Sequence, residues 1–182
     1  PKSEKYEGSI LNILEAAKNE RIDRFLYASC TCIYPNDEKT LEEDDAWKGD
    51  PPEVHASYSW SKRMGERQAI AYHKEYGMNI AIVRPSNSYG PRDSDDLETA
   101  HALGSLIIKA IDKMNPFVIW GDGSPIREYI YASDAARGML LAMENYCVGD
   151  PINLASGEFV SISELAQKIL KISNMNPEIK FD

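Results

Sequence analysis

The chain has 182 residues, of which 43% are hydrophobic, and a formal net charge of −9 at pH 7. This length suits one domain with a buried core, and acidic residues spread along the chain argue against nucleic acid or a membrane surface as a partner. No apolar run approaches a membrane span, and no secretory signal is visible. Cys30 and Cys32 stand too close for an easy disulfide, and Cys147 makes the count odd, so we expect reduced thiols and a cytoplasmic protein.

Hydrophobic periodicity predicts helices and strands that alternate along the chain. In chain order we expect a helix over 4–20, a strand over 23–29, a helix over 57–76, a strand over 79–84, a helix over 101–113, short strands over 117–119 and 128–131, a helix over 133–145, a strand over 151–154, and a helix from 161 to about 173. Gly77 is placed to end the second helix, and Ser161 with Glu164 has the form of a capping box. This order predicts a parallel α/β sheet.

A long acidic loop over residues 35–56 separates the first strand from the second helix. Loops of this length in compact domains are often functional, and the alternative is a simple solvated excursion.

A tyrosine and a lysine stand four residues apart in the second predicted helix, Tyr58 and Lys62. At this spacing both side chains leave the same face of a helix. An ammonium beside a phenol lowers the phenol pKa from its usual value of about 10, which suits an acid/base near neutral pH. The alternative is two ordinary surface residues, because the spacing often arises by chance.

Two apolar strands end in polar residues. Residues 24–35 run from Arg-Phe-Leu-Tyr-Ala into Ser-Cys-Thr-Cys-Ile-Tyr-Pro, and residues 79–92 run from Asn-Ile-Ala-Ile-Val-Arg into Pro-Ser-Asn-Ser-Tyr-Gly-Pro-Arg. In open α/β sheets, ligands bind beyond the carboxyl ends of the strands. We therefore expect both strand ends and the Tyr58/Lys62 helix to converge on one crevice.

These motifs, in this order, resemble the extended short-chain dehydrogenase/reductases of the NAD-dependent epimerase/dehydratase family, which act on nucleotide sugars. Residues 120–134, Trp-Gly-Asp-Gly-Ser-Pro-Ile-Arg-Glu-Tyr-Ile-Tyr-Ala-Ser-Asp, resemble the family's second signature. The resemblance covers nearly the whole chain. It implies a partial Rossmann-like α/β fold, part of a small substrate-binding subdomain, and NAD or NADP as cofactor.

The resemblance also implies an incomplete chain. No glycine-rich nucleotide-binding turn is found, and Gly8 is the only glycine before Gly49. We expect residues 1–91 to be the C-terminal half of the NAD(P)-binding domain. Residues 92–182 would form a partial nucleotide-sugar-binding region, interleaved with Rossmann elements around 128–155.

In the family, Tyr58 would move a sugar hydroxyl proton, and Lys62 would lower its pKa and hold the cofactor ribose. A serine or threonine normally assists the tyrosine, but the matching position here is Cys30, and a thiol is a weak hydrogen-bond partner. Ser29 or Thr31 could substitute, or catalysis could be impaired.

Sugar 4,6-dehydratases carry an aspartate and a glutamate where this chain has Thr31 and Cys32, so dehydration is not expected. Cys32 instead resembles the cysteine of GDP-L-fucose synthases and GDP-mannose 3,5-epimerases, which exchanges protons on carbons beside a keto group. His101 stands where fucose synthases have a second acid/base. The alternatives are a small buried thiol and a histidine that touches only cofactor or solvent.

The resemblance also assigns binding residues. The cofactor would be held by Ala28, Ser29, Cys30, Tyr58, Lys62, Pro85, Ser86, Asn87 and Ser88. The substrate would be held by Asn87, Lys109, Trp120 and Arg127. Arg127 matches the arginine that grips the diphosphate, for which a guanidinium is suited, while Trp120 is either a surface for base or sugar or part of the core.

We therefore expect a partial NAD(P)-dependent nucleotide-sugar epimerase/reductase that acts on a GDP- or other NDP-4-keto-6-deoxyhexose. It would epimerise C3 and C5 and then reduce C4, without a metal. The alternatives are a plain NAD-dependent 4-epimerase that uses only Tyr58 and Lys62, and an inactive fragment that serves as a binding module. The resemblance also implies a homodimer formed through helices 4–20 and 57–76.

Overall fold

The computed structural model describes residues 4–35 and 41–182, with side chains from residue 10 onward. The chain divides into two compact units, Pro1–Ser86 with Asp134–Ala155, and Asn87–Ser133 with Ser156–Asp182. The sequence places a boundary after residue 91 and Rossmann elements around 128–155; the two units separate after Ser86, and residues 134–155 belong to the first unit. No helix of the described ranges is long and apolar enough to cross a bilayer.

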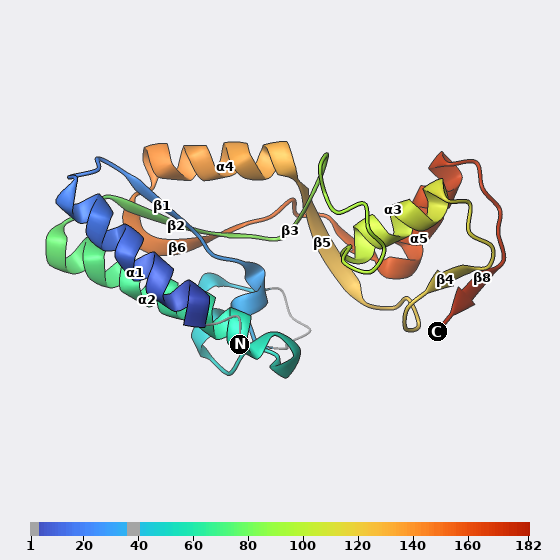
Figure 1. Cartoon of the computed structure of the whole chain (residues 1–182), viewed down its shortest axis with the longest axis horizontal. Helices are drawn as coiled ribbons and strands as arrows, with labels where there is room; N and C mark the ends of the chain where they lie inside the picture. The colour runs from blue at the N-terminus through green and yellow to red at the C-terminus, as the bar shows by residue number, and fades with distance from the viewer. Residues whose placement is uncertain (1–3, 36–40) are drawn as a thin grey trace. The chain divides into compact units, whose positions relative to one another are not determined.

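The first unit is a parallel sheet covered by helices on both faces (Figure 1). Its strands are β1 (Phe25–Ala28), β2 (Ile80–Pro85) and β6 (Val148–Leu154), in the order β1-β2-β6. Helices α1 (Glu4–Asn19) and α2 (Ala56–Tyr76) lie along one face, and α4 (Ala132–Asn145) covers the other. This arrangement confirms the predicted Rossmann-like parallel α/β fold.

The central strand β2 explains why the sheet needs helices on both sides. Ile80 and Ile82 pack with Leu14 of α1, while Ala81 and Val83 on the opposite face pack toward α4. All four β2 residues are 0% exposed. A strand buried on both faces reads as a continuous apolar run, which is the pattern of a parallel sheet.

Helix α2 lies close against β1 because it has a glycine at the contact. A Cβ atom at Gly65 would collide with the Tyr27 hydroxyl group, so only glycine permits this approach. Tyr27 Oη donates to the Lys62 carbonyl oxygen at 3.3 Å. The helix ends as predicted at Gly77, whose φ of 66° lies in the left-handed region.

A buried ion pair joins α2 to the end of β2. Arg84 donates through Nε and Nη2 to the two carboxylate oxygens of Glu66, at 2.9 and 2.7 Å. The remaining guanidinium nitrogen, Nη1, donates to Tyr34 Oη at 2.8 Å and to the Glu43 carbonyl oxygen at 2.7 Å. These bonds satisfy the buried charge and connect the acidic loop to the sheet.

The acidic loop contains two short 3-10 helices, η2 (Glu43–Trp47) and η3 (Glu53–His55). Part of the loop, residues 36–40, lies outside the described residues.

The second unit combines short strands with two packed helices. The helices are α3 (Ala102–Ile111) and α5 (Ile162–Ile172). The strands are β3 (Asn87–Tyr89), β4 (Phe117–Ile119), β5 (Ile126–Tyr131), β7 (Phe159–Ser161) and β8 (Ile179–Phe181), arranged as a β3-β5-β7 sheet and a β4-β8 pair. Leu106, Phe117 and Leu170 lie in the core of this unit. The predicted capping box of Ser161 and Glu164 is present at the start of α5.

Candidate active site

Tyr58 and Lys62 both lie in α2, beside the end of β1. Lys62 Nζ donates to the Ala28 carbonyl oxygen at 2.7 Å. The same nitrogen lies 5.7 Å from the centroid of the Tyr58 ring and 5.5 Å from that of Tyr27. Tyr58 is 48% exposed, so its ring is accessible to a ligand. The structure therefore fixes the ammonium between the tyrosine and the strand end.

Burial lowers the pKa of Lys62, and the nearby Glu66 carboxylate opposes this effect. The ammonium is half-buried and keeps a main-chain partner. A cation in such a place acts more strongly on a neighbouring phenol than one surrounded by water.

Ser29 continues the strand end after Ala28. Its main-chain N–H donates to the Val83 carbonyl oxygen at 2.8 Å, which extends the pairing of β1 with β2. Its hydroxyl group is buried and has no hydrogen-bond partner among the residues that the structure describes. Buried hydroxyl groups are nearly always paired, so this one fits a ligand that brings a polar group to the strand end.

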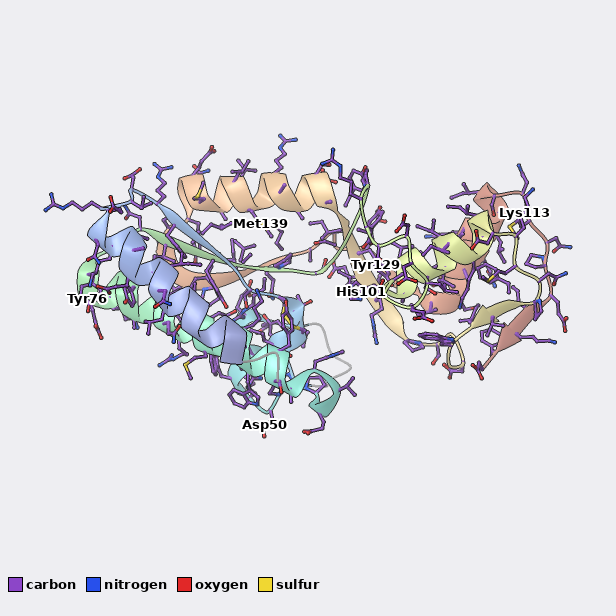
Figure 2. The ribbon with its side chains drawn as sticks, in the orientation of Figure 1. Asp50, Tyr76, His101, Lys113, Tyr129 and Met139 are labelled. Atoms are coloured by element: carbon purple, nitrogen blue, oxygen red, sulfur yellow. A yellow bond between two sulfur atoms is a disulfide. The ribbon has the colours of Figure 1, made fainter. Side chains whose placement is uncertain are left out.

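Cys30 and Cys32 form a disulfide, which corrects the expectation that both are free thiols (Figure 2). The cause is a turn that the sequence did not reveal. Cys30 is extended, with φ −160° and ψ 163°, and the 3-10 turn η1 (Thr31–Ile33) follows directly. The turn leaves the two Cα atoms 5.4 Å apart, within the range for a disulfide. In this state Cys32 has no thiol to transfer a proton.

Two residues that the sequence analysis missed lie next to this turn. Ser59 Oγ donates to the Cys32 carbonyl oxygen at 2.8 Å, and Arg63 donates twice to the Ile33 carbonyl oxygen. A sequence signal existed, because Ser59 and Arg63 repeat the spacing of Tyr58 and Lys62 one position later.

The second strand end contributes residues to both units. Pro85 ends β2, and Ser86 is buried, with its N–H bonded to the Leu154 carbonyl oxygen at 2.9 Å. Asn87 and Ser88 begin β3 and belong to the second unit. The assignment of these four residues to a cofactor stays a prediction.

The second unit brings Asn87 and Arg127 onto one sheet face. Strands β3 and β5 pair with Asn87 opposite Tyr129 and Tyr89 opposite Tyr131. Since alternate residues of a strand share a face, Arg127 lies on the same side as Tyr129 and Tyr131. The rings of Tyr89 and Tyr131 meet edge to face at 5.4 Å. The face thus combines an amide, a guanidinium and three phenol rings.

Arg127 is exposed, and its Nη1 donates to the Ile126 carbonyl oxygen at 2.8 Å. Asn87 Nδ2 donates to the Glu128 carbonyl oxygen at 3.0 Å. Both side chains are therefore held near the main chain of β5, and the guanidinium keeps further N–H groups for an anion.

His101 is the exposed residue just before α3, as predicted (Figure 2). Lys109, in the same helix, is only 6% exposed, and its Nζ donates to the Val118 carbonyl oxygen at 2.8 Å. That nitrogen lies 5.3 Å from the centroid of the Trp120 ring, and Trp120 is 72% exposed. Trp120 is thus a surface residue, and Lys109 lies against its ring and the main chain of β4.

The structure groups the predicted site residues by unit. Tyr58 and Lys62 lie with residues 28–32 in the first unit, whereas His101 and Arg127 lie in the second. Within the described part of the chain, no cluster of histidine, cysteine, aspartate or glutamate could hold a metal ion.

Comparison with known proteins connects this arrangement to one family. Residues 7–155 match the NAD dependent epimerase/dehydratase family. The chain is 31% identical to a GDP-L-fucose synthase of Sinorhizobium fredii, over 94% of this chain and 56% of the relative. It is 32% identical to a GDP-mannose 3,5-epimerase of Arabidopsis thaliana, over 87% of this chain and 43% of the relative.

A solved structure shows the same fold. The crystal structure of a GDP-L-fucose synthetase from Naegleria fowleri bound to NADP matches with a TM-score of 0.88 and 28% identity, over 97% of this chain and 56% of that one. The chain spans about half the length of the curated relatives it matches.

Proposed function

Because the chain belongs to the NAD dependent epimerase/dehydratase family, we propose that it carries the proton-transfer side of an NAD(P)-dependent nucleotide-sugar epimerase/reductase. The observation that carries this proposal is the placement of Tyr58 and Lys62, with the Lys62 ammonium held at the end of β1 by the Ala28 carbonyl oxygen. The relatives named for GDP sugars support a nucleotide sugar as the substrate class.

The cofactor we propose is NAD or NADP, in line with the NADP-bound relative. When bound, its nicotinamide supplies or accepts the hydride. The Ser29 hydroxyl group, which has no partner within the described ranges, and the Lys62 ammonium would offer a donor and a charge to the nicotinamide half. Residues 85–88 would line the same half. No glycine-rich turn for the pyrophosphate occurs in this sequence.

Tyr58 would act on the oxygen at C4 of the sugar. Its Oη donates a proton when the ketone becomes an alcohol and takes one back in reverse. The Lys62 ammonium favours the phenolate form through its charge. Cys30 stands where the family resemblance implies a serine or threonine, so the hydroxyl group that would take this role is that of Ser29 or Thr31.

Cys32 and His101 would exchange the protons at C3 and C5, which a neighbouring ketone acidifies. This step needs Cys32 as a thiol, so the disulfide with Cys30 must first be reduced. A dithiol reductant does this by attacking one sulfur; the sulfur–sulfur bond breaks, two thiols form, and the reductant becomes the disulfide. A cytoplasmic location, which we propose, would favour the reduced form.

The second unit would hold the nucleotide sugar. Arg127 would bind the diphosphate, with Asn87 on the same sheet face. Trp120, exposed and beside the Lys109 ammonium, would offer a ring for the base or the sugar.

We also propose a homodimer formed through α1 and α2. Apolar side chains on these helices are exposed, among them Leu11 at 44%, Trp60 at 45% and Met64 at 49%. Exposed apolar residues on two adjacent helices favour association with a second copy.

A 4-epimerase that uses only Tyr58 and Lys62 is the second candidate. The disulfide favours it, because it removes the Cys32 thiol and leaves the tyrosine and lysine in place.

Deuterium uptake separates the two candidates. In a reduced protein extended to the length of its relatives, a GDP-4-keto-6-deoxy sugar in heavy water should gain deuterium at C3 and C5. Cys32→Ser should slow this uptake by about two orders of magnitude, because a hydroxyl group, whose pKa lies far above the value of about 8.5 of a free thiol, hardly ionises to a base near neutral pH. Cys147→Ser is the matched control. If Cys32→Ser leaves the deuterium uptake unchanged, Cys32 does not exchange these protons, and the result favours the 4-epimerase.

A further inference from the structure

Helix α2 carries two neighbouring pairs of residues with the same spacing. Tyr58 and Lys62 form the first pair, and Ser59 and Arg63 form the second, shifted by one position. Ser59 is 0% exposed and Arg63 is 2% exposed, in contrast to the accessible Tyr58. Successive side chains of an α-helix are rotated by about 100° around its axis. Ser59 and Arg63 therefore leave a different face of α2 from Tyr58 and Lys62.

The second pair binds the turn that contains the two cysteines. Ser59 Oγ donates to the Cys32 carbonyl oxygen at 2.8 Å. Arg63 Nε and Nη2 donate to the Ile33 carbonyl oxygen at 2.9 and 2.7 Å. Two consecutive carbonyl groups of the turn are therefore held by the helix that carries Tyr58.

Arg63 also holds the acidic loop. Its Nη2 donates to the Gly49 carbonyl oxygen at 2.8 Å, and its guanidinium carbon lies 5.4 Å from the Trp47 ring centroid and 4.8 Å from that of Trp60. Contacts with aromatic rings hold a guanidinium plane in one orientation. Arg63 therefore connects three segments: the cysteine turn, the acidic loop and α2.

The hydrogen bonds of Arg63 within the described residues all end on main-chain carbonyl oxygens. This distinguishes it from Arg84, whose buried charge is paired with the Glu66 carboxylate. Burying a guanidinium is costly unless its donors are satisfied. A buried arginine whose donors are satisfied by loop carbonyl groups fixes the path of the main chain there. The buried charge needs these carbonyl groups, and the segments that carry them are held in place by the guanidinium.

We propose that Arg63, assisted by Ser59, is the positioning residue that holds the Cys30–Cys32 segment at the end of β1 beside Tyr58. This role rests on the proposed function, because a fixed Cys30–Cys32 segment serves catalysis only if the reaction takes place at Cys32 or its neighbours. It concerns geometry that can be measured without any sugar. Arg63 acts through the main chain of residues 32 and 33 and touches no reacting atom.

Thiol alkylation of the reduced chain under native conditions tests this role. Cys147 is the internal reference, because its Sγ donates to the carbonyl oxygen of Met143 in α4, and it packs beside Ala81 and Val83 rather than in the cluster that contains Cys30 and Cys32. Arg63→Lys keeps the charge but loses the forked contact. It should raise the alkylation rate of Cys30 and Cys32, relative to Cys147, by roughly tenfold, because a held segment becomes free to open.

The matched control is Arg67→Lys. Arg67 lies in the next turn of the helix, and its guanidinium carbon lies 5.7 Å from the Trp47 ring centroid, but within the described residues it makes no hydrogen bond to the cysteine turn. Its relative rate should stay within about twofold of the original chain. A general loss of stability would instead raise all three cysteine rates together.

Ser59→Ala provides a second test in case Arg63→Lys does not fold. It removes one bond to the turn and should raise the relative rate by roughly threefold. The positioning role would be overturned if Arg63→Lys folds and leaves the alkylation rate of Cys30 and Cys32 relative to Cys147 unchanged. If Arg63→Lys does not fold, an unchanged relative rate in Ser59→Ala would overturn it. Deuterium uptake at the sugar does not enter this measurement, so failure here and failure of the proposed function are separate results.

Discussion

Lys62 Nζ lies 2.7 Å from the carbonyl oxygen of Ala28, which joins α2 to the end of β1 through a single charged hydrogen bond. Gly65 makes the contact feasible, because a larger residue there would push the helix away from Tyr27. The distance between Tyr58 and the strand end therefore depends on helix packing as well as on the tyrosine and lysine themselves.

Tyr58→Phe should strongly slow hydride transfer in a protein extended to the length of its relatives. Only the proton-transfer group is removed, so the rate should fall by about two to four orders of magnitude while substrate binding stays nearly intact. Single-turnover measurement of nicotinamide absorbance checks the rate. Tyr76→Phe, at the far end of the same helix, is the control, and an equal loss in both variants would count against the role of Tyr58.

The isolated chain should self-associate through α1 and α2. Met64→Glu places a charge on this surface and should shift the chain to a monomer, measured by sedimentation at tens of micromolar. Leu140→Glu is the matched control, because Leu140 is similarly exposed, at 55%, but lies on α4 across the sheet. A monomer before any substitution would contradict the proposed dimer.

Much of the fold could be predicted because its signals are local. Gly77 and the Ser161/Glu164 capping box mark helix ends within a few residues, and both are confirmed. Strands β3, β7 and β8 were missed because each has three residues, too few for a periodic pattern, whereas the equally short β4 was predicted because its three residues are all apolar.

The site could be predicted only where its residues share an element. Tyr58 and Lys62 lie on one helix, so their spacing predicted that their side chains lie close together, while their catalytic roles stay a prediction. The contact of Arg63 with Ile33 spans 30 residues and passes through a turn that no local pattern indicated. The same turn brings Cys30 to Cys32, which is why the disulfide was not expected.

Glu66→Gln should destabilise the first unit by about 3–5 kcal/mol, because it leaves the buried Arg84 charge without its partner. Urea unfolding followed by the fluorescence of Trp47 and Trp60, in a Trp120→Phe background, measures this unit. Replacing both partners with apolar residues should cost less than the single change. Glu75→Gln, at an exposed position of the same helix, is the control; an equal cost there would refute the argument.

Stability of the second unit should fall at acid pH through Glu164. The main-chain N–H and then the hydroxyl group of Ser161 hold the pKa of Glu164 below its ordinary value of 4.5. A carboxyl with a lowered pKa contributes stability above its unfolded value and loses it as pH falls through the folded value. Glu164→Gln should therefore make the melting temperature depend less steeply on pH between about pH 5 and pH 3. Trp120 fluorescence reports the transition, and an unaltered slope would refute the assignment.

The oxidation state of Cys30 and Cys32 should control which thiols react. Without reductant, alkylation should modify Cys147 alone, and after a dithiol reductant it should modify all three cysteines, since the disulfide is then open. Mass spectrometry counts the added groups. Cys30→Ser removes the partner of Cys32 and places a hydroxyl group at the position where the family resemblance implies a serine or threonine. Its Cys32 should react with or without reductant, and deuterium uptake in the extended protein should lose its dependence on reductant.

If all three cysteines of the unmodified chain react equally without reductant, Cys32 is a free thiol in solution, and the second candidate function loses the observation that favours it.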